Sequence, residues 1–248
     1  MDLPRIFTLR ESSHRIHNPI TAEKLATVGR ALRLRPGARV LDLASGSGEM
    51  LCTWARDLGV RGTGVDISSV FTARSHSRAV ELGVSDRVDF VHDDASGYVA
   101  DEPVDVAACL GATWIGDGVP GTVDLLRRSL RPGGLLLIGH PYWRLDPPDR
   151  ATVQACHAAD PSDYLALAGL IGQFGGLGYD VVEMVLADQD SWDRYRAAQW
   201  FNLRRWLDEN PDDDLAEQVR DELRTDPASY VQHEREHLGW GVFALMAR

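Results

Sequence analysis

The chain has 248 residues, 44% of them hydrophobic and 25% charged, which is the composition of a globular protein with a substantial core. Its formal net charge of −11 argues against a nucleic-acid partner, because phosphate backbones are bound by clustered Lys and Arg. We expect a cytoplasmic protein, since no apolar run approaches the roughly 18 residues of a membrane span, the start lacks the apolar stretch of a signal peptide, and the three cysteines are far apart.

The first half of the chain alternates helical and strand patterns. Leu25, Val28 and Leu32 share one helical face and predict a helix over residues 21–32. Further helices are predicted at residues 49–58, 68–82 and 122–130, and strands at residues 38–44, 62–67, 87–93, 104–110 and 135–139. Because these strands are nearly all apolar and alternate with helices, they indicate a parallel sheet that is covered on both faces.

The second half is predicted to add helices at residues 162–174, 191–208 and 211–224 and strands at residues 179–188 and 238–247. Asn210 is expected to cap the last helix, with Pro211 at its first position and acidic residues in its first turn, where the helix dipole favours them. The chain shows neither an internal repeat nor a low-complexity linker, so we predict a single domain over residues 1–248.

An acidic residue lies inside the first predicted strand, and glycines follow at its exit. Residues 40–49 read VLDLASGSGE, with Asp42 in the strand and Gly46 and Gly48 beyond its end. Glycines at this place let the backbone approach a ligand closely, and parallel sheets bind ligands at the carboxyl ends of their strands. The second strand ends in Asp66, where a carboxylate can accept both hydroxyls of a ribose. The two units therefore predict an adenosine-containing ligand.

Two features argue against a dinucleotide as that ligand. Leu51 stands at the third glycine position of the G-x-G-x-x-G pattern. Asp42 and Glu49 flank the loop, and two carboxylates repel a pyrophosphate but suit a cation. We therefore expect adenosine with a cationic amino-acid tail, and an NAD(P)-dependent oxidoreductase is the less favoured alternative.

The same stretch resembles the first motif of the class I S-adenosylmethionine-dependent methyltransferases, of the small-molecule type. Ala44 stands where that family has its first glycine, and we expect tighter clearance from this change rather than lost binding. The resemblance extends in the family's order over roughly residues 38–140, and its later segments are GVDIS with Asp66, HDDAS with Asp94, Leu110-Gly111, and LRPGGLLLIG at residues 130–139.

The resemblance implies an α/β, Rossmann-like, seven-stranded, mostly parallel sheet with helices on both faces, an antiparallel last strand and helical lid insertions. It implies an N-terminal lid (residues 1–35), a cofactor-binding core (36–140), a substrate lid with helical insertions that include strand six (141–237), and a final strand (238–248). The cofactor would be S-adenosyl-L-methionine, with Asp66 on the ribose, Asp94 on the adenine amine and Asp42 near the methionine portion. The cofactor-binding residues implied are Asp42, Ala44, Ser45, Gly46, Gly48, Asp66, Ile67, Asp94, Ala95, Leu110 and Gly111.

Residues near the fifth strand and the N-terminus are candidates for the acceptor site. His140 directly follows the predicted fifth strand and titrates near neutral pH, so it is a candidate general base; alternatively it caps the strand end. Tyr142 and Trp143 either line the acceptor pocket or pack under a lid. His14 and His17 either contact a polar acceptor or belong to a local turn before the first helix.

The sequence HEREH at residues 233–237 matches the H-E-x-x-H zinc motif, but it immediately precedes the predicted last strand and no third ligand follows. We therefore expect polar connector residues there and no metal. Two other interpretations share the same cofactor: a non-catalytic sensor or scaffold, and an enzyme of non-methyl chemistry. As partners we expect a small-molecule acceptor, no nucleic acid and no membrane, in a monomer or homodimer.

Overall fold

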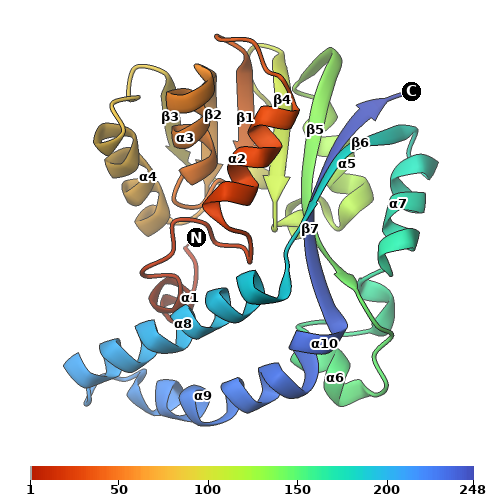
Figure 1. Ribbon diagram of the computed structural model, residues 1–248. Coiled ribbons are helices and arrows are strands. Elements are labelled where there is room, and N and C mark those ends of the chain that lie inside the picture. Colours follow the sequence, from red (N-terminus) through yellow and green to blue (C-terminus); the bar gives the residue numbers. More distant parts are fainter. Residues whose placement is uncertain (1) are drawn as a thin grey trace.

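One seven-stranded sheet, with strand order β3-β2-β1-β4-β5-β7-β6, runs through the computed structural model, which describes residues 2–248 (Figure 1). Its strands are β1 Arg39–Leu43, β2 Arg61–Asp66, β3 Val88–His92, β4 Val104–Leu110, β5 Leu130–Trp143, β6 Tyr179–Leu186 and β7 Leu238–Ala247. β1 to β5 pair in parallel, and β7 runs antiparallel to both of its neighbours, β5 and β6. The predicted Rossmann-like sheet with an antiparallel last strand is confirmed.

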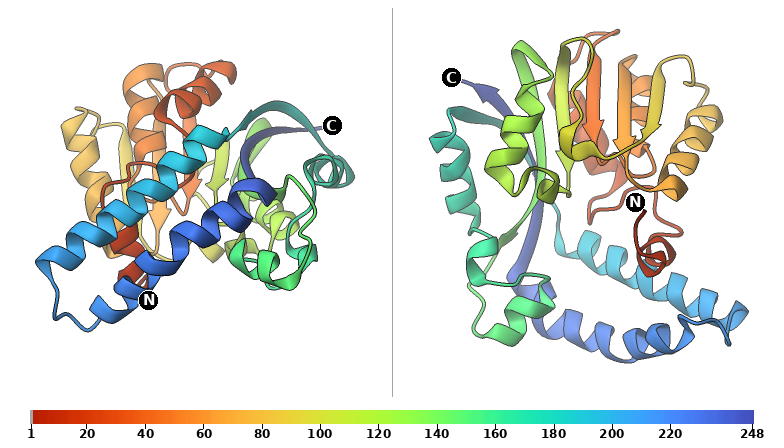
Figure 2. Two further views of the ribbon diagram at one scale, coloured as in Figure 1. Left: turned by 60° about the horizontal axis from the view of Figure 1, so that its bottom comes forward. Right: turned by 180° about the vertical axis from the view of Figure 1, so that it is seen from behind.

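Helices cover both faces of this sheet (Figures 1 and 2). They are α1 Arg5–Arg10, α2 Ala22–Ala31, α3 Glu49–Leu58, α4 Ser69–Glu81, α5 Val119–Arg127, α6 Arg150–Ala155, α7 Leu167–Gly176, α8 Gln189–Glu209, α9 Ala216–Ser229 and α10 Arg235–His237. Short turns of other helix types are η1 Ala95–Gly97, η2 Thr113–Gly116, η3 Pro161–Asp163 and the π-helical η4 Tyr230–Glu234. Neither α1 nor α6 was predicted from the sequence.

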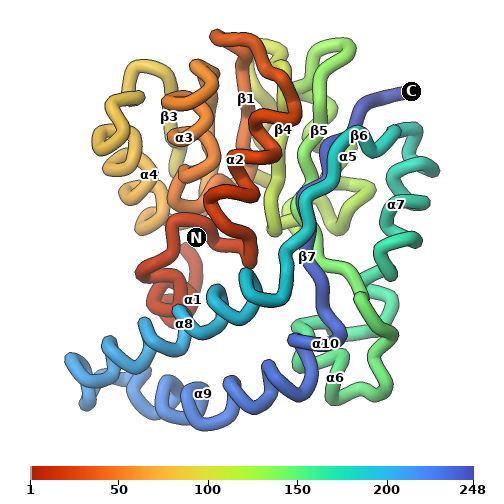
Figure 3. The backbone as a smooth tube through the Cα atoms, in the orientation of Figure 1, coloured from red at the N-terminus to blue at the C-terminus, as the bar shows by residue number. Residues whose placement is uncertain are grey.

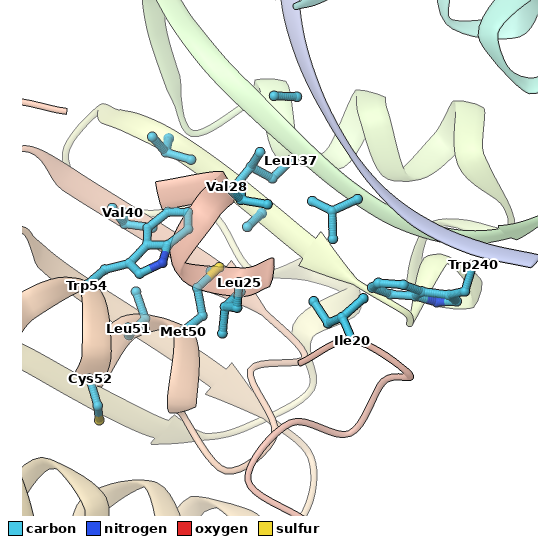
Figure 4. Close-up of a cluster of buried hydrophobic side chains, with 14 of the residues drawn as sticks. Ile20, Leu25, Val28, Val40, Met50, Leu51, Cys52, Trp54, Leu137 and Trp240 are labelled. Atoms are coloured by element: carbon cyan, nitrogen blue, oxygen red, sulfur yellow. The ribbon is translucent and has the colours of Figure 1, made fainter. Parts of the chain in front are cut away.

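The core consists of one apolar layer on each side of the sheet. On one side, Val28 of α2 and Trp54 of α3 pack against sheet residues such as Leu137 (Figure 4). On the other, Leu126 of α5 and Phe174 of α7 belong to a second buried cluster. Because the strands are buried on both faces, their nearly continuous apolar sequences are what a parallel sheet of this kind requires.

β5 is longer than predicted at both ends. Residues 131–134, which contain Pro132, bulge out of the strand where the register with β4 shifts, so the proline removes no ladder hydrogen bond from the regular part. Beyond residue 139 the strand continues by antiparallel pairing with β7, and His140 lies opposite Gly241. His140 therefore lies within β5 and does not follow it.

The last long helix begins later than predicted, because Asn210 ends α8 instead of capping α9. The side-chain amide of Asn210 donates to the Trp206 carbonyl, and α9 starts at Ala216. α7 likewise starts at Leu167 rather than at residue 162. α8 and α9 lie side by side at the carboxyl ends of the parallel strands, next to the N-terminal segment (Figure 3).

Candidate functional site

A cavity of about 340 Å³ lies at the carboxyl ends of β1 to β4. Its floor is the loop after β1, and its far side is formed by the residues that follow β2, β3 and β4. The N-terminal segment supplies the roof. Of the residues predicted to bind a ligand, those that line this cavity are His17, Asp42, Ala44, Ser45, Gly46, Asp66, Ile67, Asp94, Ala95, Leu110 and Gly111.

The loop after β1 turns sharply into α3. Ala44, Gly46 and Gly48 have φ values of +59°, +55° and +72°. A Cβ atom at Gly48 would lie 2.6 Å from Phe90 Cζ and from Ser75 Cβ, so only glycine fits there. Gly48 does not line the cavity but shapes the loop that does.

Asp66 joins this loop to the end of β2. Its Oδ2 accepts the backbone N–H of Gly46 at 2.7 Å, and its Oδ1 accepts that of Ser68 at 2.8 Å. Burial raises the pKa of Asp66, while the two backbone hydrogen bonds act in the opposite direction. Each carboxylate oxygen retains acceptor capacity, which a pair of vicinal hydroxyls in the cavity would use.

Asp42 is the second carboxylate of the cavity, and its Oδ1 is buried without a hydrogen-bond partner within the described residues. Burial, and secondarily the charge of Asp66, raises the pKa of Asp42 well above its usual value. A cationic ligand group beside this oxygen would offset that cost, because an opposite charge favours the ionised carboxylate.

Glu49, the other acid of the loop, contributes no free charge. Arg78 of α4 donates two hydrogen bonds to its carboxylate, Nε to Oε2 at 2.7 Å and Nη2 to Oε1 at 2.8 Å. The expectation that two carboxylates repel a phosphate at this loop therefore rests on Asp42 and not on Glu49.

The opposite end of the cavity is more apolar. Ile67 and Ala95 line it together with Trp114 and Ile115 of η2. Asp94 lies at its mouth, exposed, with Oδ1 accepting the Ser96 N–H at 2.9 Å. The arrangement offers a slot for a flat ring with one carboxylate at the ring's edge.

His17 and Asn18 connect the roof to the floor. His17 Nε2 lies 3.0 Å from Ser47 Oγ, and burial lowers the pKa of His17 to about 4. Asn18 Nδ2 donates to the Leu110 carbonyl at 3.0 Å, at the end of β4. Asn18 lines the cavity, although sequence reasoning did not select it.

The remaining acceptor candidates lie outside this cavity. His140 Nδ1 is 2.9 Å from Thr113 Oγ1, next to the cavity residue Ala112, and burial lowers the pKa of His140 to about 4. Tyr142 and Trp143 are buried, and Trp143 Nε1 donates to the Pro161 carbonyl at 2.8 Å. This packing favours the structural interpretation for both aromatic residues.

His14 also stays away from the cavity, because its Nδ1 is bound at 2.9 Å to Glu11 Oε2. Among residues 2–248, no group of three or more His, Cys, Asp and Glu side chains is arranged to hold a metal. In the HEREH stretch, His233 Nδ1 lies 3.0 Å from Thr152 Oγ1 and His237 Nδ1 lies 2.9 Å from the His233 carbonyl. Within residues 2–248, no helix is both long and apolar enough to cross a membrane.

Sequence comparison finds a relative along the whole chain and others along part of it. Residues 40–134 match the model of a family described as "Methyltransferase domain". The chain is 63% identical to the uncharacterized protein YjhP of Escherichia coli K12 over 248 residues, the whole of both chains. It is 34% identical over 136 residues to a 27-O-demethylrifamycin SV methyltransferase of Amycolatopsis mediterranei, covering 53% of this chain and 46% of that protein.

Several solved structures are similar along their entire length, and two of them hold a ligand. One is an S-adenosylmethionine-dependent methyltransferase of Geobacter sulfurreducens in complex with S-adenosyl-L-homocysteine, 65% identical, with a TM-score of 0.98, covering 100% of this chain and 99% of that one. The other is the corresponding complex from Thiobacillus denitrificans, 63% identical, with a TM-score of 0.98 and full coverage of both chains.

Proposed function

Since the chain belongs to the S-adenosylmethionine-dependent methyltransferases and uses S-adenosyl-L-methionine as its cofactor, we propose that it methylates a small-molecule acceptor. The observation that carries the assignment of the cofactor site is the cavity at the ends of β1 to β4, with Asp42 and Asp66 in its wall. We treat the chain as one domain in which the N-terminal segment covers this cavity.

Three carboxylates along the cavity fit three parts of the cofactor. Asp66 would accept the ribose hydroxyls, since its carboxylate is already oriented by two backbone N–H groups. Asp42 would face the amino group of the methionine portion, because its Oδ1 is buried and otherwise unpartnered. Asp94 would accept the adenine amine, with the ring between Ile67 and Ala95.

The bound cofactor supplies an electrophilic methyl group on a sulfonium. The chain's contribution is to orient it and to exclude water: the roof residues His17 and Asn18 close over the loop, which fixes the geometry needed for in-line attack. Orientation of this kind is worth about 7–11 kcal/mol in well-aligned reactions.

His140 is our candidate for removing a proton from the acceptor; it does not line the cavity, but its partner Thr113 follows the cavity residue Ala112. Burial lowers the pKa of His140 to about 4, so the ring is neutral at pH 7 but a weaker base than the near-neutral titration expected from the sequence, and a bound acceptor would have to raise this pKa for efficient proton removal. When Nδ1–H donates to Thr113 Oγ1, the lone pair on Nε2 is available to the acceptor. A substitution His140→Gln then lowers turnover without weakening cofactor binding.

Isothermal titration with S-adenosylmethionine, NAD and NADP tests the cofactor site. We expect binding of the first alone, and Asp66→Asn should weaken it about 10- to 100-fold, because a hydrogen bond to a charged group is worth about 1.5–3 kcal/mol. Asp180→Asn is the matched control, since Asp180 pairs with Arg248 on β6, away from the cavity. No binding of S-adenosylmethionine by folded wild-type protein would refute the proposal, and binding without turnover of any acceptor would favour a sensor.

A further inference from the structure

A buried carboxylate that the cofactor site does not use connects the cavity roof to a distant pair of helices. Glu11 is fully buried in the segment of residues 2–20, which we call the cover segment. Its Oε1 accepts the hydroxyl of Tyr195 at 2.9 Å and the side-chain amide of Gln199 at 2.6 Å. Both donors lie on α8, within residues 189–229, which we call the helical arm. His14 occupies the other oxygen, Oε2, at 2.9 Å.

The same tyrosine also reaches the roof of the cavity. The Tyr195 hydroxyl lies 3.1 Å from the carbonyl oxygen of His17. His17 in turn rests on the loop after β1: its Nε2 is 3.0 Å from Ser47 Oγ, and a Cβ atom at Gly46 would lie 2.9 Å from its Nδ1. One hydroxyl on the arm thus joins the buried carboxylate to the residue that contacts the cofactor loop.

Further contacts attach the outer part of the cover segment to the arm. Arg10 forms two bonds of 2.5 Å to Glu222 of α9, and its carbonyl accepts the Asn202 amide at 2.7 Å. Arg5 pairs with Asp213 at 2.9 Å. By contrast, α1 has only six residues and none of them is buried. A helix this short has little stability of its own, so its position depends on these contacts with the arm and on contacts with α4, where Arg74 donates to the Glu11 carbonyl at 3.1 Å and Phe7 packs against Phe71.

From these contacts we infer that the helical arm is a clamp that holds the cover segment closed over the cofactor, and that Glu11 is its positioning residue. This inference rests on the proposed function, because the ligand retained is S-adenosylmethionine. Replacing the Glu11 carboxylate by the neutral amide of glutamine weakens the acceptor that Tyr195 and Gln199 share, because hydrogen bonds to a charged oxygen are about twice as strong, and it places an NH2 group where His14 now meets an oxygen. The cover segment then opens more often, and the cofactor dissociates faster.

The test uses the full chain with the variants Glu11→Gln, Tyr195→Phe and the two combined. Titration and stopped-flow measurement should show S-adenosylmethionine bound at least tenfold more weakly by each single variant, mainly through faster dissociation. The combined variant should be about as weak as the weaker single one, since both changes break the same contact.

Glu234→Gln is the matched control. Glu234 is likewise a buried carboxylate, just beyond the arm, and it pairs with Arg196 and His157. It reaches the Glu11 contact only indirectly, because Arg196 Nη1 donates to Gln199 Oε1 at 2.6 Å. The affinity of the Glu234→Gln variant for S-adenosylmethionine should stay within twofold of wild type. Equal losses in Glu234→Gln and Glu11→Gln would overturn the inference, because the effect would then be a general loss of structure in the arm. Wild-type affinity in both Glu11→Gln and Tyr195→Phe would overturn it as well.

Limited trypsin digestion without ligand separates this inference from the proposed function. Opening of the cover segment should expose the bonds after Arg10 and Arg15, so Glu11→Gln should be cut there several-fold faster than wild type and Glu234→Gln should not. Failure of wild type to bind S-adenosylmethionine would refute the proposed function, while the digestion still decides whether the clamp exists. Unchanged cleavage in Glu11→Gln would refute the clamp.

Discussion

Ala44 holds a backbone conformation that residues with a side chain rarely adopt. Its φ of +59° is in the left-handed region, which costs a non-glycine residue about 1–2 kcal/mol. The consequence of replacing the family's first glycine is therefore backbone strain in the loop, rather than only the tighter clearance that the sequence suggested.

Ala44→Gly should relieve this strain. The gain is partly offset by the greater freedom of glycine in the unfolded chain, about 0.4–1 kcal/mol, so we expect a net stabilisation of up to about 1 kcal/mol. Thermal unfolding should show a rise in Tm of roughly 1–4 °C, with the affinity for S-adenosylmethionine little changed. Ala44→Val should have the opposite effect, since a β-branched residue tolerates positive φ poorly, and a lower Tm in Ala44→Gly would contradict this account.

Two half-buried histidines make the folded protein sensitive to acid. Burial lowers the pKa of His17 and of His140 to about 4, whereas an unfolded histidine titrates near 6.5. Between these values the unfolded chain binds protons that the folded protein excludes. The free energy of unfolding therefore falls as the pH drops from about 6.5 to about 4, by at most about 1.4 kcal/mol per pH unit for each histidine.

His140→Gln should make the free energy of unfolding depend less steeply on pH, by the contribution of one histidine. Denaturant unfolding at several pH values between 4 and 7 measures the free energy of unfolding of the variant and of wild type. The titration of groups other than His140 cancels in the difference between the two. Parallel curves for the two proteins would show that His140 takes up its proton equally well in the folded state.

How much of the site could be predicted depends on whether its residues carry a local signal. Asp42 and Asp66 lie near the ends of apolar strands and Gly46 follows the first of them, so the sequence alone placed all three at one edge of the sheet. Glu11 and Arg78 carry no such signal. Their partners Tyr195 and Glu49 come from elements far along the chain, and only the fold brings them together.

At the scale of elements, the strands and helices with strong periodicity were predicted well. The errors concern residue types that occur in more than one kind of local structure. Asn210 and Pro211 are as typical of a helix start as of the turn after a helix, and here Asn210 ends α8. The fifth strand was predicted only over residues 135–139, which lie between Pro132 and Pro141. The pairing of Pro141 with Trp240 on β7 extends it, and no local pattern reveals a partner so far downstream.

The junction between β4 and the cover segment allows a matched comparison of two glycines. Gly111 has a φ of +90°, and a Cβ atom there would overlap Asn18 Oδ1; Gly83 has a φ of +65° with open space around it. Gly111→Ala should displace Asn18 and weaken S-adenosylmethionine binding at least tenfold. Gly83→Ala carries the backbone strain alone and should lower Tm without this loss, so equal affinities in the two variants would contradict a role for the Asn18 contact.

At the scale of the whole molecule, the site joins the first residues of the chain to the helical arm near its other end. Hydrogen exchange should therefore show that S-adenosylmethionine slows exchange in residues 2–20 and in α8, in addition to the loop after β1. β6 and α7 lie at the other side of the sheet and should exchange at unchanged rates (Figure 1). Uniform slowing over all elements would show that the ligand stabilises the fold globally and does not act through the cover segment.

The strand order has a consequence for biosynthesis. Within residues 2–248, β6 forms its ladder with β7 alone, and β7 is inserted between β5 and β6 although the ribosome makes it after both. Until the helical arm has been translated and β7 has emerged, the free edge of β5 and both edges of β6 lack a strand partner. Such edges invite pairing with other chains, so the interval between synthesis of β6 and synthesis of β7 is when this protein is most exposed to misassembly.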